Sequence, residues 1–275
     1  MRNDNNASTA RITHAEAPVD LLQQGQPRAL SHAVIRSTRR TPVRSAQAHA
    51  AQSVVLEQHQ IKALADALRA RQRTTYERVV KPVMDRLIAG LLILVLSPVL
   101  LVIWLTVLLA LGRPVILGQR RAGLDGTPFT MLKFRTMLPD RRAVAPSDVY
   151  AGPERRRTHK SMKDPRHTRL GRMMRKMSLD ELPQLFNVLL GRMSLVGPRP
   201  EMYHLIHGYS PWQRTRHLVK PGLTGLWQTT ERGRGLALHE CIDLDLIYID
   251  GLCLRTDLTI LGRTPLALLR VRNVI

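Results

Sequence analysis

Cysteine and aromatic residues are scarce in this 275-residue chain. The two cysteines, Cys241 and Cys253, lack the spacing of a metal site and suggest no disulfide framework, which favours a reducing compartment. Aromatics make up 4% of the residues, which argues against modules that bind nucleic acid by base stacking. The sequence also lacks a GxGxxG fingerprint, a P-loop and a GxSxG nucleophile elbow. Nothing in it therefore supports Rossmann or P-loop nucleotide binding.

Acidic residues are also few compared with basic ones. Lys and Arg number 42 against 21 Asp and Glu, and the formal net charge is +21. A charge of this sign and size implies polyanionic partners such as anionic lipid, phosphorylated substrates or nucleic acid. The low aromatic content makes nucleic acid the weakest of the three, and we expect no nucleic-acid partner.

One apolar run stands out, from Leu87 to Leu111, with no charged residue in about 25 positions. Its length is enough to cross a bilayer core as one helix, but Ser97-Pro98 lies near its centre, where proline must kink or break a helix. Basic residues flank both ends, which places both ends in the cytoplasm by the positive-inside rule: Lys81, Arg86, Arg113, Arg120 and Arg121. The run therefore predicts a hairpin that enters one leaflet and returns, although a proline-kinked spanning helix fits the run alone equally well.

The chain divides into three parts around this run. Residues 1–78 are expected to form a basic extension, disordered over its first 50 residues, with an amphipathic helix at 54–73 that is either a solvated regulatory segment or a membrane-surface helix. Residues 79–112 are expected to form the membrane hairpin. Residues 113–275 are expected to form a cytoplasmic domain that carries the catalytic candidates described below.

The expected fold class is α+β, with mostly short helices and a small β element, anchored by the broken re-entrant helix and by interfacial amphipathic helices. Short strands are predicted at 114–119 and 129–134 around a turn at 124–127, and a charged loop at 141–164. Helices are predicted at 179–190, 201–207, 239–249 and 258–269, and the last of them could lie on the membrane surface.

The sharpest local signal is Ser178-Leu-Asp-Glu-Leu-Pro-Gln-Leu-Phe-Asn. Ser178 followed by Glu181 makes a capping-box pattern, so Asp180 and Glu181 have a purely structural interpretation as helix-start residues. Yet helix starts favour anions, and basic residues lie just before this one: Arg172, Arg175 and Lys176. Such a carboxylate pair can supply a nucleophile and hold a magnesium ion on phosphate oxygens.

Three further basic residues are candidates for phosphate contacts. Pro198 and Pro200 hold Arg199 on a rigid extended turn, which suits bidentate contacts, although an isolated loop arginine is more often simply solvated. Lys133 and Arg135 alternate on a predicted strand, so their side chains are expected on one face, which could also be an ordinary solvated face.

Taken in order, the motifs resemble a known family. They are Lys81-Pro-Val-Met-Asp-Arg, the run broken at Ser97-Pro98, Phe129-Thr-Met-Leu-Lys-Phe-Arg-Thr-Met, Lys163-Asp-Pro-Arg, the Asp180-Glu181 segment, Ser194-Leu-Val-Gly-Pro-Arg-Pro and Val219-Lys-Pro-Gly-Leu-Thr-Gly-Leu-Trp-Gln. Together, over about residues 79–267, they resemble the bacterial sugar transferases, the monotopic polyprenyl-phosphate phosphoglycosyl transferases.

The resemblance implies a re-entrant membrane helix and transfer of a sugar phosphate from a nucleotide-sugar, usually a UDP-sugar, to a polyprenyl phosphate. Asp180 would attack the β-phosphate and carry a covalent phosphosugar, and Glu181 would help Asp180 to hold Mg²⁺. The resemblance also implies substrate contacts from Lys133, Arg135, Arg166, Arg175, Arg199 and Arg232. It places the protein in the bacterial inner membrane, facing the cytoplasm, at the start of surface-glycan synthesis with downstream glycosyltransferases as partners, and a homodimer is plausible.

Two departures from the family pattern bear on donor choice. Glu231 stands where the family usually has glycine, and Gly251-Leu-Cys replaces an Asn-Trp-Ser. Glu231 and the long basic extension motivate an alternative hypothesis, a catalytically degenerate, membrane-anchored assembly or regulatory protein of a glycan pathway. The high positive charge motivates another, a membrane-tethered nucleic-acid binder, which the intact Asp-Glu pair and the few aromatics oppose.

Overall fold

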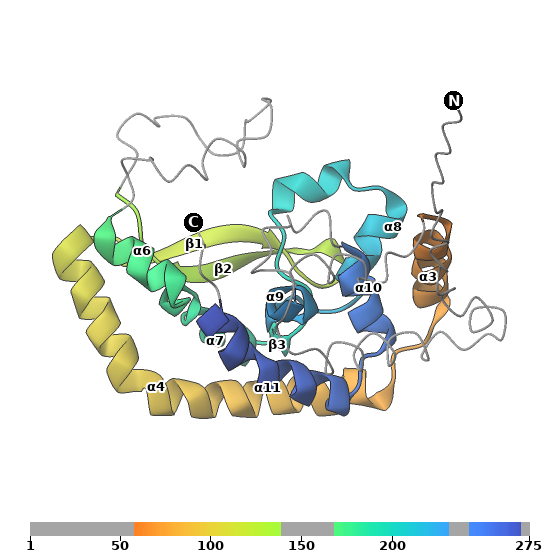
Figure 1. Ribbon diagram of the computed structural model, residues 1–275, viewed down its shortest axis with the longest axis horizontal. Coiled ribbons are helices and arrows are strands. Elements are labelled where there is room, and N and C mark those ends of the chain that lie inside the picture. The colour runs from red at the N-terminus through yellow and green to blue at the C-terminus, as the bar shows by residue number, and fades with distance from the viewer. Residues whose placement is uncertain (1–57, 139–167, 231–241, 271–275) are drawn as a thin grey trace, which may run out of the picture.

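The computed structural model of the protein describes residues 58–138, 168–230 and 242–270. Its longest helix, α4 (Lys81–Leu111), continues directly from a π-helical turn, η1 (Tyr76–Val80). Figure 1 shows α4 as a long arm along one side of the molecule and a second arm that turns sharply away from it. Most of the other described elements lie within the angle between the two arms, so α4 forms an outer edge of the fold.

The predicted kink is confirmed, but the helix bends without being interrupted. Pro98 lies inside α4 and has no N–H to donate to the carbonyl of Leu94, one turn earlier. The Ser97 hydroxyl donates to that carbonyl instead, at 2.8 Å, so the polar group freed by the proline is satisfied within the helix. The Ser-Pro pair therefore produces a bent helix whose arms diverge, rather than a break with a closed turn.

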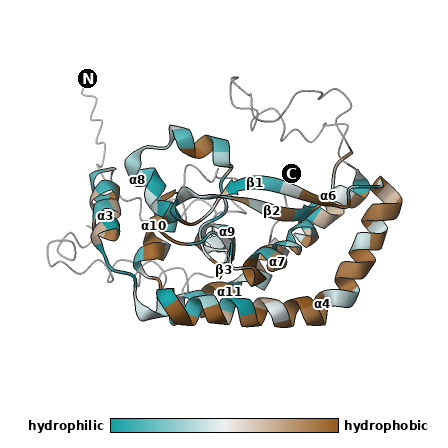
Figure 2. Ribbon diagram, turned by 180° about the vertical axis from the view of Figure 1, so that it is seen from behind, coloured by the Kyte–Doolittle hydropathy of each residue, from teal (hydrophilic) through white to brown (hydrophobic). Residues whose placement is uncertain are grey.

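The outer surface of α4 is apolar and exposed. Only 6% of its most apolar 18-residue window is buried, and α4 is long and apolar enough to cross a membrane by length and composition. Large side chains along it stay open to solvent, among them Leu87, Leu91, Leu94, Leu101 and Leu109. In Figure 2, which colours the ribbon by hydropathy, both arms of α4 are mostly brown, for hydrophobic residues. An exposed apolar surface of this extent indicates a membrane-associated protein.

A β-hairpin lies on the inner side of α4. Strands β1 (Ile116–Ala122) and β2 (Pro128–Phe134) pair antiparallel, with Ile116 opposite Phe134, and the turn η2 (Leu124–Gly126) joins them as predicted. Phe134 packs with Val107 of the second arm of α4 in a small apolar cluster. The hairpin is thereby fixed to α4.

A second pair of strands was not predicted. Strands β3 (Ser194–Val196) and β4 (Gly222–Thr224) pair in parallel, with Ser194 opposite Gly222. Each strand has three residues, too few for a periodic sequence signal. The pairing brings together two segments that are well separated in the sequence, and it carries the loop described below.

Short helices account for most of the remaining described chain, so the expected α+β class is confirmed. They are α3 (Gln58–Ala70), α6 (Arg169–Lys176), η3 (Leu179–Glu181), α7 (Gln184–Leu189), η4 (Tyr203–Gly208), α8 (Pro211–Arg214), η5 (Thr215–Leu218), α9 (Leu226–Thr230), α10 (Ile242–Asp250) and α11 (Leu254–Arg270). The predicted helix at 201–207 is a 3₁₀-helix, and the one at 179–190 is divided between η3 and α7.

Helix α3 packs into the protein instead of extending from it. Its apolar stripe, Ile61, Ala65 and Leu68, is buried in the main core, and α3 contacts α10 and α8. The helical part of the 54–73 prediction is confirmed, but neither of the two expected environments, solvent or membrane surface, is observed. Residues 58–78 therefore belong to the folded body, while the predicted disordered segment and the 141–164 loop lie outside the described residues.

Candidate active site

The Asp-Glu pair lies on a short turn between two helices. Asp180 and Glu181 belong to the 3₁₀ turn η3, which follows α6 after Ser178 in the left-handed conformation (φ 55°). The predicted capping box is wrong, because the Ser178 side chain does not cap this turn. The chain must change direction directly after α6, and that reversal takes precedence over the local capping pattern.

Two cations from distant segments converge on this pair. Both carboxylates are largely buried, with Asp180 7% and Glu181 8% exposed. Lys133 Nζ, from β2, lies 3.0 Å from Glu181 Oε1 and 4.0 Å from Asp180 Oδ2. Arg199 Nη2, from the loop after β3, lies 3.2 Å from the same Glu181 oxygen. Four of the predicted site residues thus form one cluster.

Burial and neighbouring charges have opposing effects on the pKa of Asp180. Burial raises the pKa of the Asp180 carboxyl, and the neighbouring Glu181 carboxylate raises it further. Lys133 and Arg199 lower that pKa, since positive charge favours the ionised form. The pKa of Asp180 is raised overall because burial is the largest of these effects, and the two cations limit the rise.

Asn187 was missed by the sequence analysis, although it ends the segment singled out there. Its amide oxygen accepts from the Leu132 N–H at 2.9 Å, and its amide nitrogen donates to the Thr130 carbonyl at 2.8 Å. These bonds satisfy the edge of β2 that faces away from β1, and fix α7 beside the strand that carries Lys133. The dyad and its lysine are thereby held in register.

Arg199 is held by two further residues to which the sequence analysis assigned no role. Its guanidinium carbon lies 5.9 Å from the centre of the Trp227 ring on α9, a cation–π distance. Its carbonyl accepts a 3.0 Å hydrogen bond from Arg216, which is fully buried and ion-paired with Asp245 at 2.7 Å. Trp227 stands in a quoted motif, whereas no sequence signal marked Arg216.

Arg135 takes a different position from the one expected. Strand β2 ends at Phe134, so the strand alternation that was to align Arg135 with Lys133 no longer applies. Its guanidinium donates to the carbonyls of Leu111, Gly112 (2.6 Å) and Arg113 (3.1 Å) at the end of α4. Unpaired carbonyls at a helix C-terminus attract a cation, which explains this placement.

The other predicted basic residues lie on α6 or outside the described residues. Arg175 lies on α6, where its Nε is 3.4 Å from the Gly171 carbonyl of the same helix. Arg166 and Arg232 lie outside the described residues, as does the departure at Glu231. In the described part of the chain, no three His, Cys, Asp or Glu side chains gather as a metal site.

Comparison with known proteins identifies the family. The model of the family described as bacterial sugar transferase matches residues 76–271. The chain belongs to the bacterial sugar transferase family. The match begins at η1 and extends to the end of α11, so it includes α4, both strand pairs and the dyad of this sugar transferase.

Curated relatives resemble this sugar transferase over about two thirds of its length. The uncharacterized sugar transferase EpsL of Bacillus subtilis is 38% identical over 189 residues, 68% of this chain and 85% of the relative. A UDP-glucose:undecaprenyl-phosphate glucose-1-phosphate transferase of Klebsiella pneumoniae is 40% identical, covering 68% of this chain and 39% of the relative. An undecaprenyl-phosphate galactose phosphotransferase of Salmonella typhimurium is 36% identical, covering 70% and 41%. The chain thus spans about two fifths of these two longer relatives.

Proposed function

We propose that the protein transfers a sugar 1-phosphate from a UDP-sugar to a polyprenyl phosphate, and so begins synthesis of a surface polysaccharide. The observation that carries the proposal is the buried Asp180–Glu181 pair within reach of Lys133 and Arg199. A carboxylate beside fixed cations is suited to attack on a diphosphate, whose negative charge would otherwise repel it. The names of the Klebsiella and Salmonella relatives support the same substrate classes.

The proposed chemistry has two displacements at one phosphorus atom. An Asp180 carboxylate oxygen attacks the β-phosphorus of the donor, and the bond from that phosphorus to the bridging oxygen breaks, which releases UMP. A phosphate oxygen of the lipid then attacks the phosphosugar on Asp180, and the bond from phosphorus to the aspartyl oxygen breaks. The products are a polyprenyl-diphosphate-sugar and a regenerated carboxylate.

Lys133 and Arg199 have a double role in this proposal. In the free protein they neutralise Glu181, because Lys133 Nζ and Arg199 Nη2 lie 3.0 Å and 3.2 Å from its Oε1. Their side chains are partly exposed, so an arriving diphosphate could contact both of them in place. The donor phosphates would then take over part of the ion pairing that Glu181 provides to these two cations. The carboxylate of Glu181 would become available as an oxygen ligand for another cation.

Magnesium fits the donor set as a further proposal. Mg²⁺ is bound in many phosphoryl-transfer sites by one or two carboxylates together with substrate phosphates, and not by a full protein cage. Asp180 and Glu181 offer the oxygen atoms for such binding, which agrees with the lack of a third carboxylate or histidine in the described part of the chain. When bound, the ion would neutralise charge on the diphosphate.

The membrane arrangement is proposed on the surface that the helices expose. Beyond α4, large apolar side chains are exposed on α7 and α11, such as Phe186, Leu189, Leu258 and Leu266. Basic residues at both ends of the apolar run favour placing both ends of α4 on the cytoplasmic side. We propose that α4 enters one leaflet of the inner membrane and returns, with the dyad at its cytoplasmic surface.

The experiment is UMP release by detergent-solubilised protein with polyprenyl phosphate, magnesium and a panel of UDP-sugars. We expect one donor to give UMP and a lipid-linked product, and Asp180→Asn to abolish both. Incubation with the donor alone should leave a phosphosugar on wild-type protein, detected by intact-mass spectrometry, and none on the variant. Lipid-linked product from Asp180→Asn at the wild-type rate would refute the assignment of the nucleophile.

A further inference from the structure

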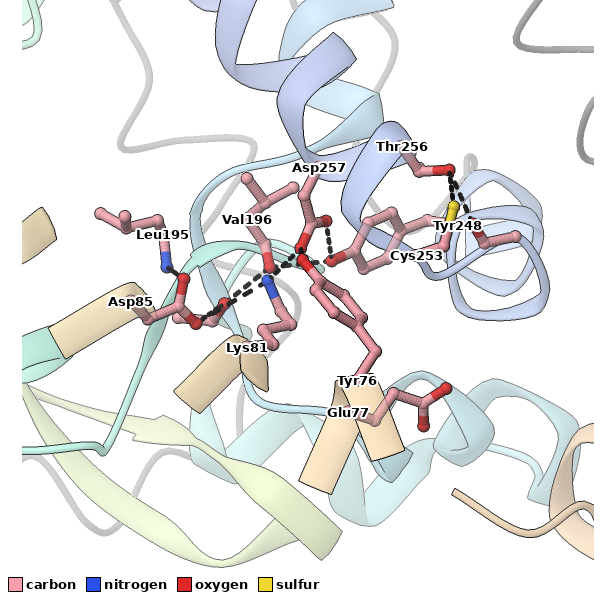
Figure 3. Close-up of polar contacts among 12 residues, drawn as sticks. Tyr76, Glu77, Lys81, Asp85, Leu195, Val196, Tyr248, Cys253, Thr256 and Asp257 are labelled. Carbon is pink, nitrogen blue, oxygen red and sulfur yellow. Dashed lines mark hydrogen bonds and ion pairs between the residues drawn. The ribbon is translucent and has the colours of Figure 1, made fainter. Parts of the chain in front are cut away.

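The start of the membrane helix is joined to the protein body by a buried polar network (Figure 3). Lys81, in the first turn of α4, lies 2.6 Å from Asp257 Oδ2 of α11 and 3.7 Å from Asp85 Oδ2, one turn further along α4. The hydroxyls of Tyr76 and Tyr248 lie 2.7 Å and 2.9 Å from the two oxygens of the same Asp257. The network thus gathers around the N-terminal end of α4, well before the bend at Pro98.

The network contacts strand β3 at each of its three residues. Asp85 accepts from the Ser194 hydroxyl at 2.6 Å and from the Leu195 N–H at 3.3 Å. The Tyr248 hydroxyl lies 2.9 Å from the Val196 carbonyl. Both Asp85 and Tyr248 are buried, so these bonds compete little with water.

Strand β3 leads directly into the loop that carries Arg199. Pro198 and Pro200 flank Arg199, and proline fixes φ, so this loop has few ways to absorb a shift of the strand before it. The loop is also tied to β4, since Gly222 N–H donates to the Pro198 carbonyl at 2.8 Å. We therefore expect a displacement of β3 to shift the guanidinium beside the dyad.

We propose that Asp85 and Tyr248 are positioning residues, which fix Arg199 relative to the start of the membrane helix through β3. On this view the helix does more than anchor the protein: its first turns set where the arginine stands relative to the lipid surface. The consequence for turnover rests on the proposed function, while the geometric claim does not. Neither residue contacts the dyad in any described hydrogen bond or ion pair, so any effect on catalysis must pass through β3.

Two tyrosines make a matched pair of variants. Tyr76→Phe and Tyr248→Phe each remove one hydroxyl from Asp257, but only Tyr248 also contacts β3. We expect Tyr248→Phe to lower kcat/KM for the donor roughly tenfold, because small displacements of a catalytic contact are costly, and Tyr76→Phe to change it less than about twofold. Asp85→Asn should behave like Tyr248→Phe. Assays run well below the melting temperature of each variant.

A double-mutant cycle separates positioning from general weakening. In an Arg199→Lys background, Tyr248→Phe should lose most of its effect on kcat/KM, because the group it places has already been replaced. If the Tyr248→Phe effect is unchanged in that background, or if both tyrosine variants lower activity equally, the proposal is overturned.

Fluorescence tests the geometry without turnover. The chain has three tryptophans, and with Trp104→Phe and Trp212→Phe only Trp227, beside the Arg199 guanidinium, emits. We expect Tyr248→Phe to shift this emission and Tyr76→Phe to leave it as in the parent. An unchanged emission in Tyr248→Phe would overturn the proposal, whereas absence of UMP release from the parent with every donor would count against the proposed function alone.

Discussion

Two buried clusters in this protein each combine arginine with two acidic side chains, but they differ in access. At the dyad, the cations Lys133 and Arg199 keep 16% and 28% of their side chains exposed above carboxylates that are nearly buried. In the other cluster, Arg216 is 0% exposed, between Asp245 at 2.7 Å and Glu201 at 3.6 Å. The cations of the first cluster are accessible from solvent, whereas the arginine of the second is fully enclosed.

The difference teaches where an ion pair serves chemistry and where it serves the fold. Arg216 of the enclosed cluster donates a 3.0 Å hydrogen bond to the Arg199 carbonyl. The enclosed (closed) cluster therefore supports the accessible (open) cluster at the dyad. Closed pairs are costly to break, because the remaining charge stays buried without a partner. A pair with a more accessible cation loses less when the cation is replaced, since water can partly solvate the charge that remains. Each of the following variants tests one side of this contrast.

The largest effect on stability is expected from Arg216→Met. It leaves Asp245 and Glu201 buried without their cation, and should lower the free energy of unfolding by about 3–5 kcal/mol. Thermal unfolding in detergent measures the change. Arg214→Met is the matched control, because Arg214 is exposed and bonds only backbone carbonyls of Tyr209 and His207 in the described contacts, and should cost less than about 1 kcal/mol. Equal losses of unfolding free energy in Arg216→Met and Arg214→Met would contradict the special role of the buried cluster.

The next effect concerns pH and the histidine beside Arg216. Burial, aided by the Arg216 charge and opposed by Glu201, lowers the pKa of His217 to about 4. The unfolded chain therefore binds this proton more readily, and wild type should lose up to about 3 kcal/mol relative to His217→Gln as the pH falls from about 6.5 to 4.

The comparison with His217→Gln is needed because a neighbour titrates in the opposite sense. Burial raises the pKa of Asp245 to about 6, which adds stability as the pH falls through the same range. Asp245, Glu201 and Tyr209 are common to both proteins, so their contributions cancel in the difference. Melting curves between pH 8 and 4 check it, and parallel curves for the two proteins would contradict the assignment.

On the open side, Arg199→Lys should affect activity far more than stability. Lysine keeps the charge but loses the planar fork and the flat contact with Trp227, so kcat/KM for the donor should fall about 10- to 100-fold. The melting temperature should change little, because Arg199 is partly exposed. Steady-state kinetics and thermal unfolding of the same preparation measure the two effects. A loss of melting temperature as large as that of Arg216→Met would contradict the contrast between the two clusters.

The smallest expected effect is on the stability of Asp180→Asn. Burial raises the pKa of this carboxyl in the folded protein, so ionisation costs stability above the ordinary aspartate range. Asp180→Asn should therefore melt at a higher temperature than wild type near pH 8. The difference should vanish at a pH low enough that Asp180 is protonated in both the folded and the unfolded wild-type protein. A lower melting temperature near pH 8 would show that the dyad stabilises the fold.

Patterns that a short segment carries by itself predicted much of this fold. The apolar run, its proline and the strand–turn–strand at 116–134 were correctly predicted, because burial and backbone constraints act locally there. The grouping of Asp180 and Glu181 with Lys133 and Arg199 was anticipated through ordered motifs, and not through spacing. Asn187 and Arg216 were missed because their partners lie far away in the sequence.

The sequence by itself determined that a long apolar helix bends at Pro98 and that an acidic pair lies in a basic chain. The tertiary structure decided which cations reach that pair: Lys133 does, whereas Arg135, two residues away, caps the end of α4. It also decided that α3 packs into the core and that Asp85 of α4 bonds Ser194 of β3, the strand that precedes Arg199. The physical reason is that helix and kink arise from neighbours in the chain, whereas charge pairing and burial depend on groups that only folding brings together.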